Sequence, residues 1–187
     1  MMENGDFQLL QIALDYAARI HGSELKKKTP VPYIFHPLAV ASLVLQFQGD
    51  FAQAAAGAIH DTIEKGKEEY FKDLFGNEVT ELAFSFLDPD VGEDLPWESL
   101  KAHYLAKIRH LSARALLVIA CEELHDSRSL NYEVRQYGED VWERYPVEKD
   151  QVIWYYQELL KIFRNKLIGN PLVDEFAQAV ADLKSLE

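Results

Sequence analysis

Apolar residues recur at helical spacing along nearly the whole chain, and this pattern constrains the fold more than any other feature. In the segment 7–21, for example, Leu10, Leu14, Ala17 and Ile20 follow the 3.6-residue repeat of an α-helix and form one apolar stripe. Strand-like alternation appears nowhere over a useful length, and no repeat of 20–50 residues is visible. The pattern therefore predicts an all-α fold.

Turn and capping residues divide the chain into expected helices. Asp6 and Asp50 are suited to N-cap positions, Gly22 and Gly66 to helix ends, and Pro37 to a first helical turn. The expected helices cover residues 7–21, 37–48, 51–65, 68–75, 78–86, 97–110, 112–129, 133–142, 148–167 and 172–186.

The length of 187 residues favours one domain, since a chain of this size can bury a sizeable core without disulfides. An acidic, turn-rich loop at 88–96 could divide two domains, but neither side of it shows a complete core pattern. We therefore expect a single helical-bundle domain over residues 1–187. Its core motifs lie at about 8–130 and its C-terminal helices at about 131–187.

Charge and composition limit the partners. The net charge of −12 argues against nucleic acid, because phosphate-backbone binding needs a basic face. It leaves open a small phosphorylated substrate, which a bound cation can recruit. The single cysteine fits a reducing compartment. Neither a signal peptide nor an apolar run of membrane-spanning length is visible, so a cytoplasmic protein without membrane contact is expected.

Candidate metal ligands stand at four positions. His36 lies where an irregular loop enters a helix, His60 and Asp61 are adjacent near the end of an alanine-rich helix, and Glu122 lies in an apolar stretch that turns acidic. Imidazole with carboxylate is a ligand set for manganese, iron or zinc in hydrolytic sites. On spacing alone this signal is weak, because a lone helical histidine is more often a hydrogen-bonded core residue.

Longer motifs carry a resemblance to a known family. The runs are HGSELKKKTPVPYIFHPLAVA, AAAGAIHDTIEKG, LFGNEVTELA and VIACEELHDSRSL. Together they resemble the HD superfamily of metal-dependent phosphohydrolases, and more specifically the hydrolase domain of Rel/SpoT-type alarmone enzymes and the small stand-alone alarmone hydrolases. The closing stretch YGEDVWERYPVEKDQVIWYYQELLKIF also resembles the C-terminal helices of stand-alone members, so the likeness spans about residues 8–185.

The resemblance implies a fold, an activity and a cofactor. The family is an all-helical bundle that holds one divalent ion, usually manganese, with iron, zinc or magnesium as alternatives here. Its enzymes hydrolyse the 3′-pyrophosphate of guanosine tetra- or pentaphosphate. His36, His60 and Asp61 match three metal ligands of the family, and Glu122 stands where the family has a fourth, an Asp. Glu64 matches the first member of a Glu-Asp pair that positions or activates the attacking water.

Substrate-binding candidates surround these positions. Lys26, Lys27 and Lys28 precede His36 and can hold phosphate groups, although a solvated loop is an equally good interpretation of three consecutive lysines. Arg128 matches an arginine of the family pattern and is expected at the wall of the site. Asp126, which replaces a family Asn, falls in the same acidic stretch.

Departures from the family pattern concentrate around the same pocket. Glu122 is one methylene longer than the Asp it replaces, which flexible oxygen coordination can absorb. Lys65 replaces the second acid of the Glu-Asp pair, so Glu64 would act alone or Lys65 would meet a substrate phosphate. Asp126 adds negative charge where an anionic substrate would lie. The family's arginine before the loop lysine aligns with Leu25, and the loop to Pro32 is about two residues longer.

Two functional hypotheses follow. The first is a metal-dependent phosphohydrolase of altered specificity, acting on a nucleotide or another small pyrophosphorylated compound. Compounds similar to guanosine 3′,5′-bis(diphosphate) are among the candidate substrates. The alternative is a catalytically degenerate member that binds a nucleotide or a protein partner without turnover, which Lys65 and Asp126 motivate. The oligomeric state stays open, with a homo-oligomer as one option.

Overall fold

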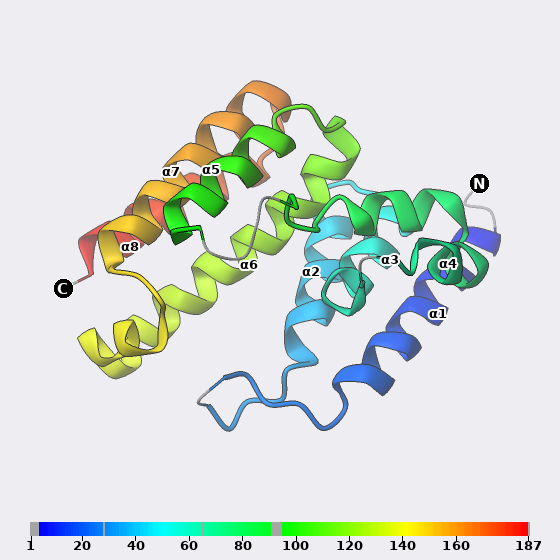
Figure 1. Ribbon diagram of the computed structural model, residues 1–187, viewed down its shortest axis with the longest axis horizontal. Helices are drawn as coiled ribbons and strands as arrows, with labels where there is room; N and C mark the ends of the chain where they lie inside the picture. Colours follow the sequence, from blue (N-terminus) through cyan, green and yellow to red (C-terminus); the bar gives the residue numbers. More distant parts are fainter. Residues whose placement is uncertain (1–3, 28, 65, 91–94, 187) are drawn as a thin grey trace. The chain divides into compact units, whose positions relative to one another are not determined.

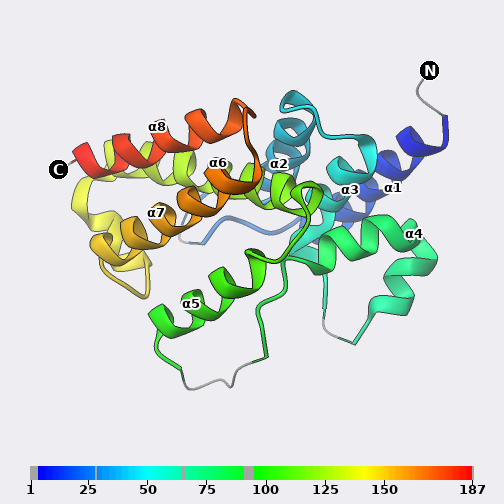
Figure 2. The same ribbon diagram turned by 90° about the horizontal axis from the view of Figure 1, so that it is seen from above.

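The computed structural model describes residues 4–27, 29–64, 66–90 and 95–186, with side chains from residue 7 onward. These residues form helices joined by loops, with one isolated antiparallel bridge between Leu25 and Pro32 and no strand among them (Figures 1 and 2). The all-α prediction is confirmed. The α-helices are α1 (Asn4–His21), α2 (Phe35–Gln46), α3 (Phe51–Ile59), α4 (Glu68–Phe84), α5 (Trp97–Ile108), α6 (Ala113–Tyr137), α7 (Lys149–Lys166) and α8 (Leu172–Ser185).

Two compact units make up the chain. One contains residues 1–87 and the α6 segment 117–122, and the other contains residues 88–116 and 123–187. The first unit is built around α3, which packs against α1, α2 and α4. In the second unit α7 packs against α5 and α8. The expected single domain over residues 1–187 stays a prediction.

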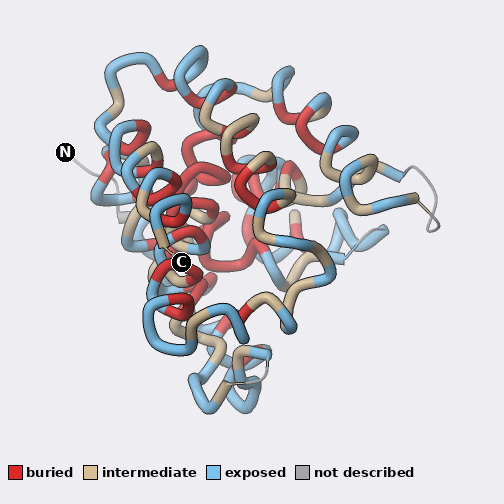
Figure 3. Tube along the Cα trace, turned by 90° about the vertical axis from the view of Figure 1, so that its left-hand side faces the viewer, coloured by how far each residue is buried: buried red, intermediate tan, exposed pale blue. Residues whose placement is uncertain are grey.

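Helix α3 is the centre of the first unit because its small residues let neighbouring helices approach. Asp50 caps it as expected, accepting a hydrogen bond from the Gln53 backbone N–H while the Gln53 side chain accepts from the Asp50 N–H. Every residue from 52 to 59 is buried. Figure 3 shows how buried and exposed residues are distributed along the described chain. A Cβ added to Gly57 would lie 3.1 Å from Val40 Cγ1 and 3.4 Å from Val118 Cγ1. Glycine at this position therefore allows α2 and α6 to pack closely on α3.

Three expected helix boundaries are wrong. Helix α1 begins at Asn4, so Asp6 lies inside its first turn instead of capping it. Helix α3 ends at Ile59, and His60–Thr62 form a 3₁₀ turn, η1, where the sequence pattern predicted α-helix to residue 65. The two helices expected at 112–129 and 133–142 are one helix, α6, followed by the 3₁₀ segment η2 (Gly138–Arg144). Leu130 and Asn131 are buried on α6, and burial there outweighs the weak helix propensity of Ser129 and Asn131.

The break expected at Gly76 is present. Gly76 has φ 77° and ψ 169°, which interrupts α4 between its two predicted segments. L-amino acids with side chains rarely adopt this conformation, so glycine sets the position of the kink.

Side-chain interactions connect α6 to α8 within the second unit. Arg128 and Arg135 on α6 form ion pairs with Glu175 and Asp182 on α8. Between these pairs, the buried Asn131 side chain donates a hydrogen bond to the Ala179 carbonyl oxygen at 2.8 Å. No described helix combines the length and the apolar character that crossing a membrane requires.

Candidate metal centre

All four predicted metal ligands belong to the first unit, although they lie far apart in sequence. His36 is the second residue of α2, His60 and Asp61 open the 3₁₀ turn after α3, and Glu122 comes from the α6 segment of this unit. Both histidines are buried, whereas 31% of the Asp61 side-chain surface is accessible to solvent. The tighter winding of the 3₁₀ turn directs the adjacent His60 and Asp61 side chains about 120° apart.

The ligand atoms of these residues converge. His36 Nε2 lies 3.1 Å from His60 Nε2 and 3.4 Å from Asp61 Oδ2, and His60 Nε2 lies 3.2 Å from Asp61 Oδ1. His36, His60 and Glu122 each offer a ligand atom within 4.8 Å of the other two. The structure thus brings together the four residues that the sequence singled out. Their role as ligands stays a prediction.

These distances fit a bound divalent cation. Nitrogen and oxygen ligands placed about 2.1 Å from one ion lie about 3.0 Å apart at a right angle and about 3.4 Å apart in a tetrahedron. The three separations among His36, His60 and Asp61 fall at these values. Two imidazoles and carboxylates form a donor set suited to manganese, iron or zinc.

A hydrogen bond sets the tautomer of His60. Its Nδ1 lies 2.8 Å from the Gly57 carbonyl oxygen, which can only accept, so Nδ1 carries the proton. In the neutral ring Nε2 then presents a lone pair toward His36 and Asp61. This is the arrangement in which metal-binding histidines are held by a backbone carbonyl. Phe86 packs on the same ring, with centroids 4.9 Å apart, and so limits its rotation.

Tyr33 contacts the cluster and was missed as a site residue by the sequence analysis. Its hydroxyl donates a hydrogen bond to Asp61 Oδ2 at 2.5 Å. The Tyr33 ring lies between two histidine rings, with centroids 5.0 Å from His21 and 5.7 Å from His36. Tyr33 occurs in the motif that carries His36, but spacing alone does not reveal a contact with a residue 28 positions away.

The loop before His36 is held in place by backbone and side-chain contacts. The Tyr33 N–H donates to the Glu24 carbonyl oxygen, and the Lys26 N–H donates to the Val31 carbonyl oxygen, each at 2.8 Å. The buried His21 places Nδ1 2.6 Å from Glu24 Oε2, and its ring packs against that of Tyr33 at a tilted angle. These contacts fix the Tyr33 ring, and through it the Asp61 carboxylate.

Cys121 does not provide a thiolate beside Glu122. It is fully buried, and burial raises the pKa of its thiol well above the usual range. A protonated thiol is a poor metal ligand. The candidate ligands in this part of the first unit are therefore imidazoles and carboxylates.

The described residues among the other predicted catalytic and substrate-binding positions make local contacts of their own. Glu64 is exposed, and its carboxylate pairs with Lys67 Nζ at 2.6 Å. Lys26 Nζ lies 6.0 Å from the centroid of the Phe35 ring, and Lys27 is exposed. Lys28 and Lys65 lie outside the described residues. The roles assigned to these five residues stay predictions.

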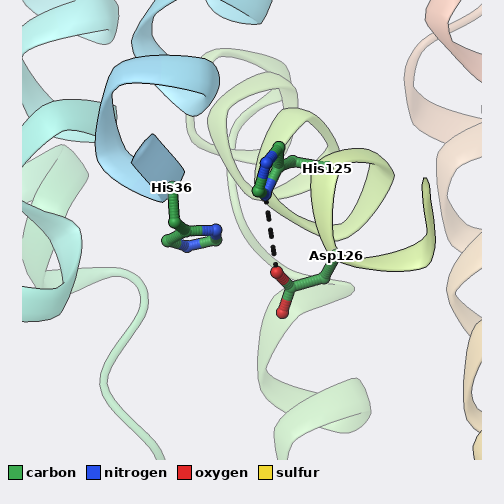
Figure 4. Close-up of side chains that lie close together, drawn as sticks. All are labelled: His36, His125 and Asp126. Atoms are coloured by element: carbon green, nitrogen blue, oxygen red, sulfur yellow. Dashed lines mark ion pairs between the residues drawn. The ribbon is translucent and has the colours of Figure 1, made fainter. Parts of the chain in front are cut away.

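Asp126 and Arg128 belong to the second unit. Asp126 Oδ1 lies 3.7 Å from His125 Nδ1 on the neighbouring position of α6, an ion pair when His125 is protonated (Figure 4). Figure 4 also draws His36 at the start of α2. Arg128 pairs with Glu175 on α8. This pairing occupies the guanidinium that the sequence assigned to substrate, and its predicted role is not tested by the structure.

Comparison with known proteins decides the family. The family model described as HD domain matches residues 13–144, which is more than half of the chain. The chain belongs to the HD-domain family. The family that the sequence motifs resemble is thereby confirmed.

Curated relatives of this HD-domain protein include Rel/SpoT-type proteins. It is 30% identical over 137 residues to a GTP pyrophosphokinase of Myxococcus xanthus, covering 68% of this chain and 18% of the relative. It is 32% identical over 129 residues to a probable guanosine-3′,5′-bis(diphosphate) 3′-pyrophosphohydrolase of Synechocystis sp., covering 64% of this chain and 16% of the relative. The chain therefore spans less than a fifth of the length of these relatives.

Solved structures share the fold over most of the chain. A crystal structure of a Listeria monocytogenes EGD-e protein superposes with a TM-score of 0.69 and 27% identity, covering 78% of this chain and 96% of that one. A metazoan ortholog of SpoT, described as hydrolysing ppGpp, superposes with a TM-score of 0.73 over 96% of this chain and 97% of its own. At 20% identity the latter likeness concerns the fold alone.

Proposed function

We propose that this chain is a metal-dependent phosphohydrolase acting on a nucleotide or a related small pyrophosphorylated compound. The convergence of His36, His60, Asp61 and Glu122 carries the proposal, because two buried imidazoles and two less buried carboxylates whose ligand atoms lie this close together suit one divalent ion. Membership of the HD-domain family supports it. The name of the Synechocystis relative makes guanosine 3′,5′-bis(diphosphate) the first substrate to test.

His36, His60, Asp61 and Glu122 would hold the ion, and Tyr33 would orient Asp61. A divalent ion in this position supplies a Lewis acid that polarises a phosphoryl oxygen and lowers the pKa of a coordinated water. The buried faces of both histidines limit solvent around the ligand atoms, which strengthens electrostatic attraction to a phosphate. We propose manganese as the resident ion, with iron, zinc and magnesium as the alternatives to compare.

Glu64 is the proposed proton acceptor. Its Oε atoms would take a proton from the attacking water, a role that typically contributes about 10²–10⁴-fold to a rate. The present ion pair with Lys67 must then open or be shared, since it occupies the Glu64 carboxylate. Lys26, Lys27 and Lys28 are proposed to hold the phosphates of the substrate, and Arg128 with Asp126 to border it.

The activity is tested by pyrophosphate release. The purified protein is stripped with a chelator, reloaded separately with Mn²⁺, Fe²⁺, Zn²⁺ or Mg²⁺, and incubated with guanosine 3′,5′-bis(diphosphate) and with a panel of nucleoside polyphosphates. We expect metal-dependent release that Glu64→Gln lowers by about 10²-fold or more, while Glu69→Gln, at another exposed ion-paired glutamate, leaves the rate unchanged. Absence of release from every substrate with every metal contradicts the proposal.

One observation favours binding without turnover as a second candidate function. The Glu64 carboxylate is paired with Lys67, and the sequence places a second lysine, Lys65, where the family has an acid. A chain with this arrangement would retain metal and nucleotide but lack a proton acceptor. Saturable, metal-dependent nucleotide binding without any product would support this alternative over the hydrolase.

A further inference from the structure

Acidic residues are absent from three long stretches of an otherwise acidic chain. The chain contains 31 Asp and Glu, yet residues 25–49, 99–121 and 159–173 contain none. The basic residues of the second and third stretches are Lys101, Lys107, Arg109, Arg114, Lys161, Arg164 and Lys166. These two stretches include the last turns of α5 and α7, where basic residues therefore have few acidic neighbours in sequence.

Part of this charge surrounds a cavity in the second unit. Helices α5 and α7 pack against each other (Figure 1), and a cavity of about 370 Å³ lies between the residue that follows α5 and the last turns of α7. Arg109 lines it from the α5 side, and Lys161, Asn165 and Lys166 line it from α7. Ile162, which is buried, supplies an apolar wall.

The cavity carries an excess of positive charge. Glu158 is one turn before Ile162 on α7 and pairs with both Arg109, at 3.6 Å, and Lys161. One carboxylate thus compensates two cations, and Lys166 adds a third cation to the lining. The negative ends of the α5 and α7 dipoles favour lysine in a last turn. The helix dipoles do not explain why cations from α7 and from the residue after α5 line the same cavity. Nor do they explain why the acid-free stretches extend well beyond the last helical turns.

We propose that this pocket binds the phosphate groups of a small oligophosphate. Its volume falls within the range of small-ligand sites. Guanidinium, ammonium and amide groups together match the oxygens of a di- or polyphosphate. The net charge of −12 opposes a long nucleic acid, whose many phosphates would extend onto acidic surface. The pocket shares no residue with the candidate metal centre, so it is a second ligand site that the proposed hydrolase function does not require.

The experiment uses inorganic pyrophosphate with the 187-residue chain in which His60 and Asp61 are both replaced by Ala. Metal is removed from this variant by chelation. Binding is measured by calorimetry at about 0.15 M salt, where weak long-range attraction is screened. We expect saturable binding to one site. The double variant Lys161→Ala with Lys166→Ala should weaken it by about tenfold or more, because each lost charge-assisted hydrogen bond weakens binding by about that factor.

A matched control separates the pocket from overall charge. Lys72→Ala with Lys184→Ala removes the same charge elsewhere and should leave the affinity unchanged. Conversely, Glu158→Gln should raise the affinity severalfold, because it removes the carboxylate that competes for Arg109 and Lys161. Glu139→Gln, at an exposed position, should leave the affinity for pyrophosphate unchanged. Repeating the titration with guanosine diphosphate shows whether the phosphates come from a nucleotide or from free pyrophosphate. If guanosine diphosphate binds more tightly than pyrophosphate, the natural ligand is a nucleotide. If the two bind equally, it is free pyrophosphate.

The proposal is overturned by absence of saturable pyrophosphate binding or by equal losses of affinity in the two lysine double variants. An unchanged affinity in Lys161→Ala with Lys166→Ala would overturn it as well. Binding of an acidic peptide at this pocket with no binding of pyrophosphate or guanosine diphosphate would also reject it, in favour of a protein partner. Because the assay uses a chain without His60 and Asp61, its result does not depend on the proposed hydrolase activity.

Discussion

The Nε2 atoms of His36 and His60 lie 3.1 Å apart although the residues are separated by 24 positions in sequence. His60 Nδ1 donates to the Gly57 carbonyl oxygen, so its neutral ring turns a lone pair toward His36. Asp61 lies within 3.4 Å of both rings. A cation between these groups would satisfy the lone pairs and the carboxylate together.

Tyr33→Phe should weaken metal binding without unfolding the protein. The ring that packs between His21 and His36 is retained, while the hydrogen bond to Asp61 is lost. Groups that orient metal ligands typically change affinity by about 10–100-fold. A competition titration with a metal indicator measures the loss, and the melting temperature of the chelated protein checks the fold. Tyr132→Phe, at an exposed tyrosine, is the control. Equal affinities for Tyr33→Phe and the wild type would reject the positioning role.

Replacing Glu122 by the shorter Asp should preserve metal binding, whereas replacing it by Ala should weaken it. Because even groups behind metal ligands contribute about tenfold or more to affinity, Glu122→Ala should lower metal affinity by at least about tenfold. Glu122→Asp retains the carboxylate and restores the residue of the family pattern, so its affinity should stay near that of the wild type. The same indicator titration compares the two. A tenfold loss in Glu122→Asp would mean that the cluster requires the longer side chain.

Gly57→Leu should destabilise the first unit. Even a Cβ at this position meets Val40 and Val118 at 3.1 and 3.4 Å, and a larger side chain has no space between them. Overpacking of this kind costs about 1–3 kcal/mol in the free energy of unfolding. Ala102→Leu, at an exposed position of α5, should change it by less than about 0.5 kcal/mol. Urea unfolding of both variants provides the comparison, and equal midpoints would contradict the close packing inferred for α3.

Lys65→Asp should raise the rate at which the protein hydrolyses guanosine 3′,5′-bis(diphosphate). The substitution restores the second acid of the Glu-Asp pair that the motif predicts, and a proton-transfer group contributes about 10²–10⁴-fold. Steady-state rates with the metal-loaded protein test this. Lys72→Asp makes the same charge change at another lysine and should have no effect. If the two variants respond alike, substrate choice is determined elsewhere in the chain.

The sequence predicted the fold because helical periodicity and capping residues leave strong local signals. It singled out the four candidate metal ligands through their resemblance to a known family, and their role as ligands stays a prediction. Helical periodicity located the elements, the Asp50 cap began α3 as expected, and Gly76 broke α4. The errors have physical causes. Burial of Leu130 and Asn131 carried α6 across a stretch of poor helix formers, and a 3₁₀ turn ended α3 before the His60–Asp61 pair.

Tertiary contacts were beyond the reach of the sequence. The Tyr33–Asp61 hydrogen bond joins a loop to a turn, and no spacing rule encodes it. The pairing of Arg128 with Glu175 likewise depends on how α6 packs against α8. Residue type made Arg128 a good phosphate ligand in principle, but its partner could be found only from the packing of the two helices.

Metal content tests the central claim most directly. The protein is chelated, loaded with Mn²⁺, passed through a desalting column and analysed by mass spectrometry for ions per chain. The account predicts about one ion per wild-type chain and none in the double variant His60→Ala with Asp61→Ala. The control double variant His103→Ala with Asp140→Ala, at two exposed positions, should still bind about one ion per chain. The same metal content in the wild type and in the double variant lacking His60 and Asp61 would contradict the assignment.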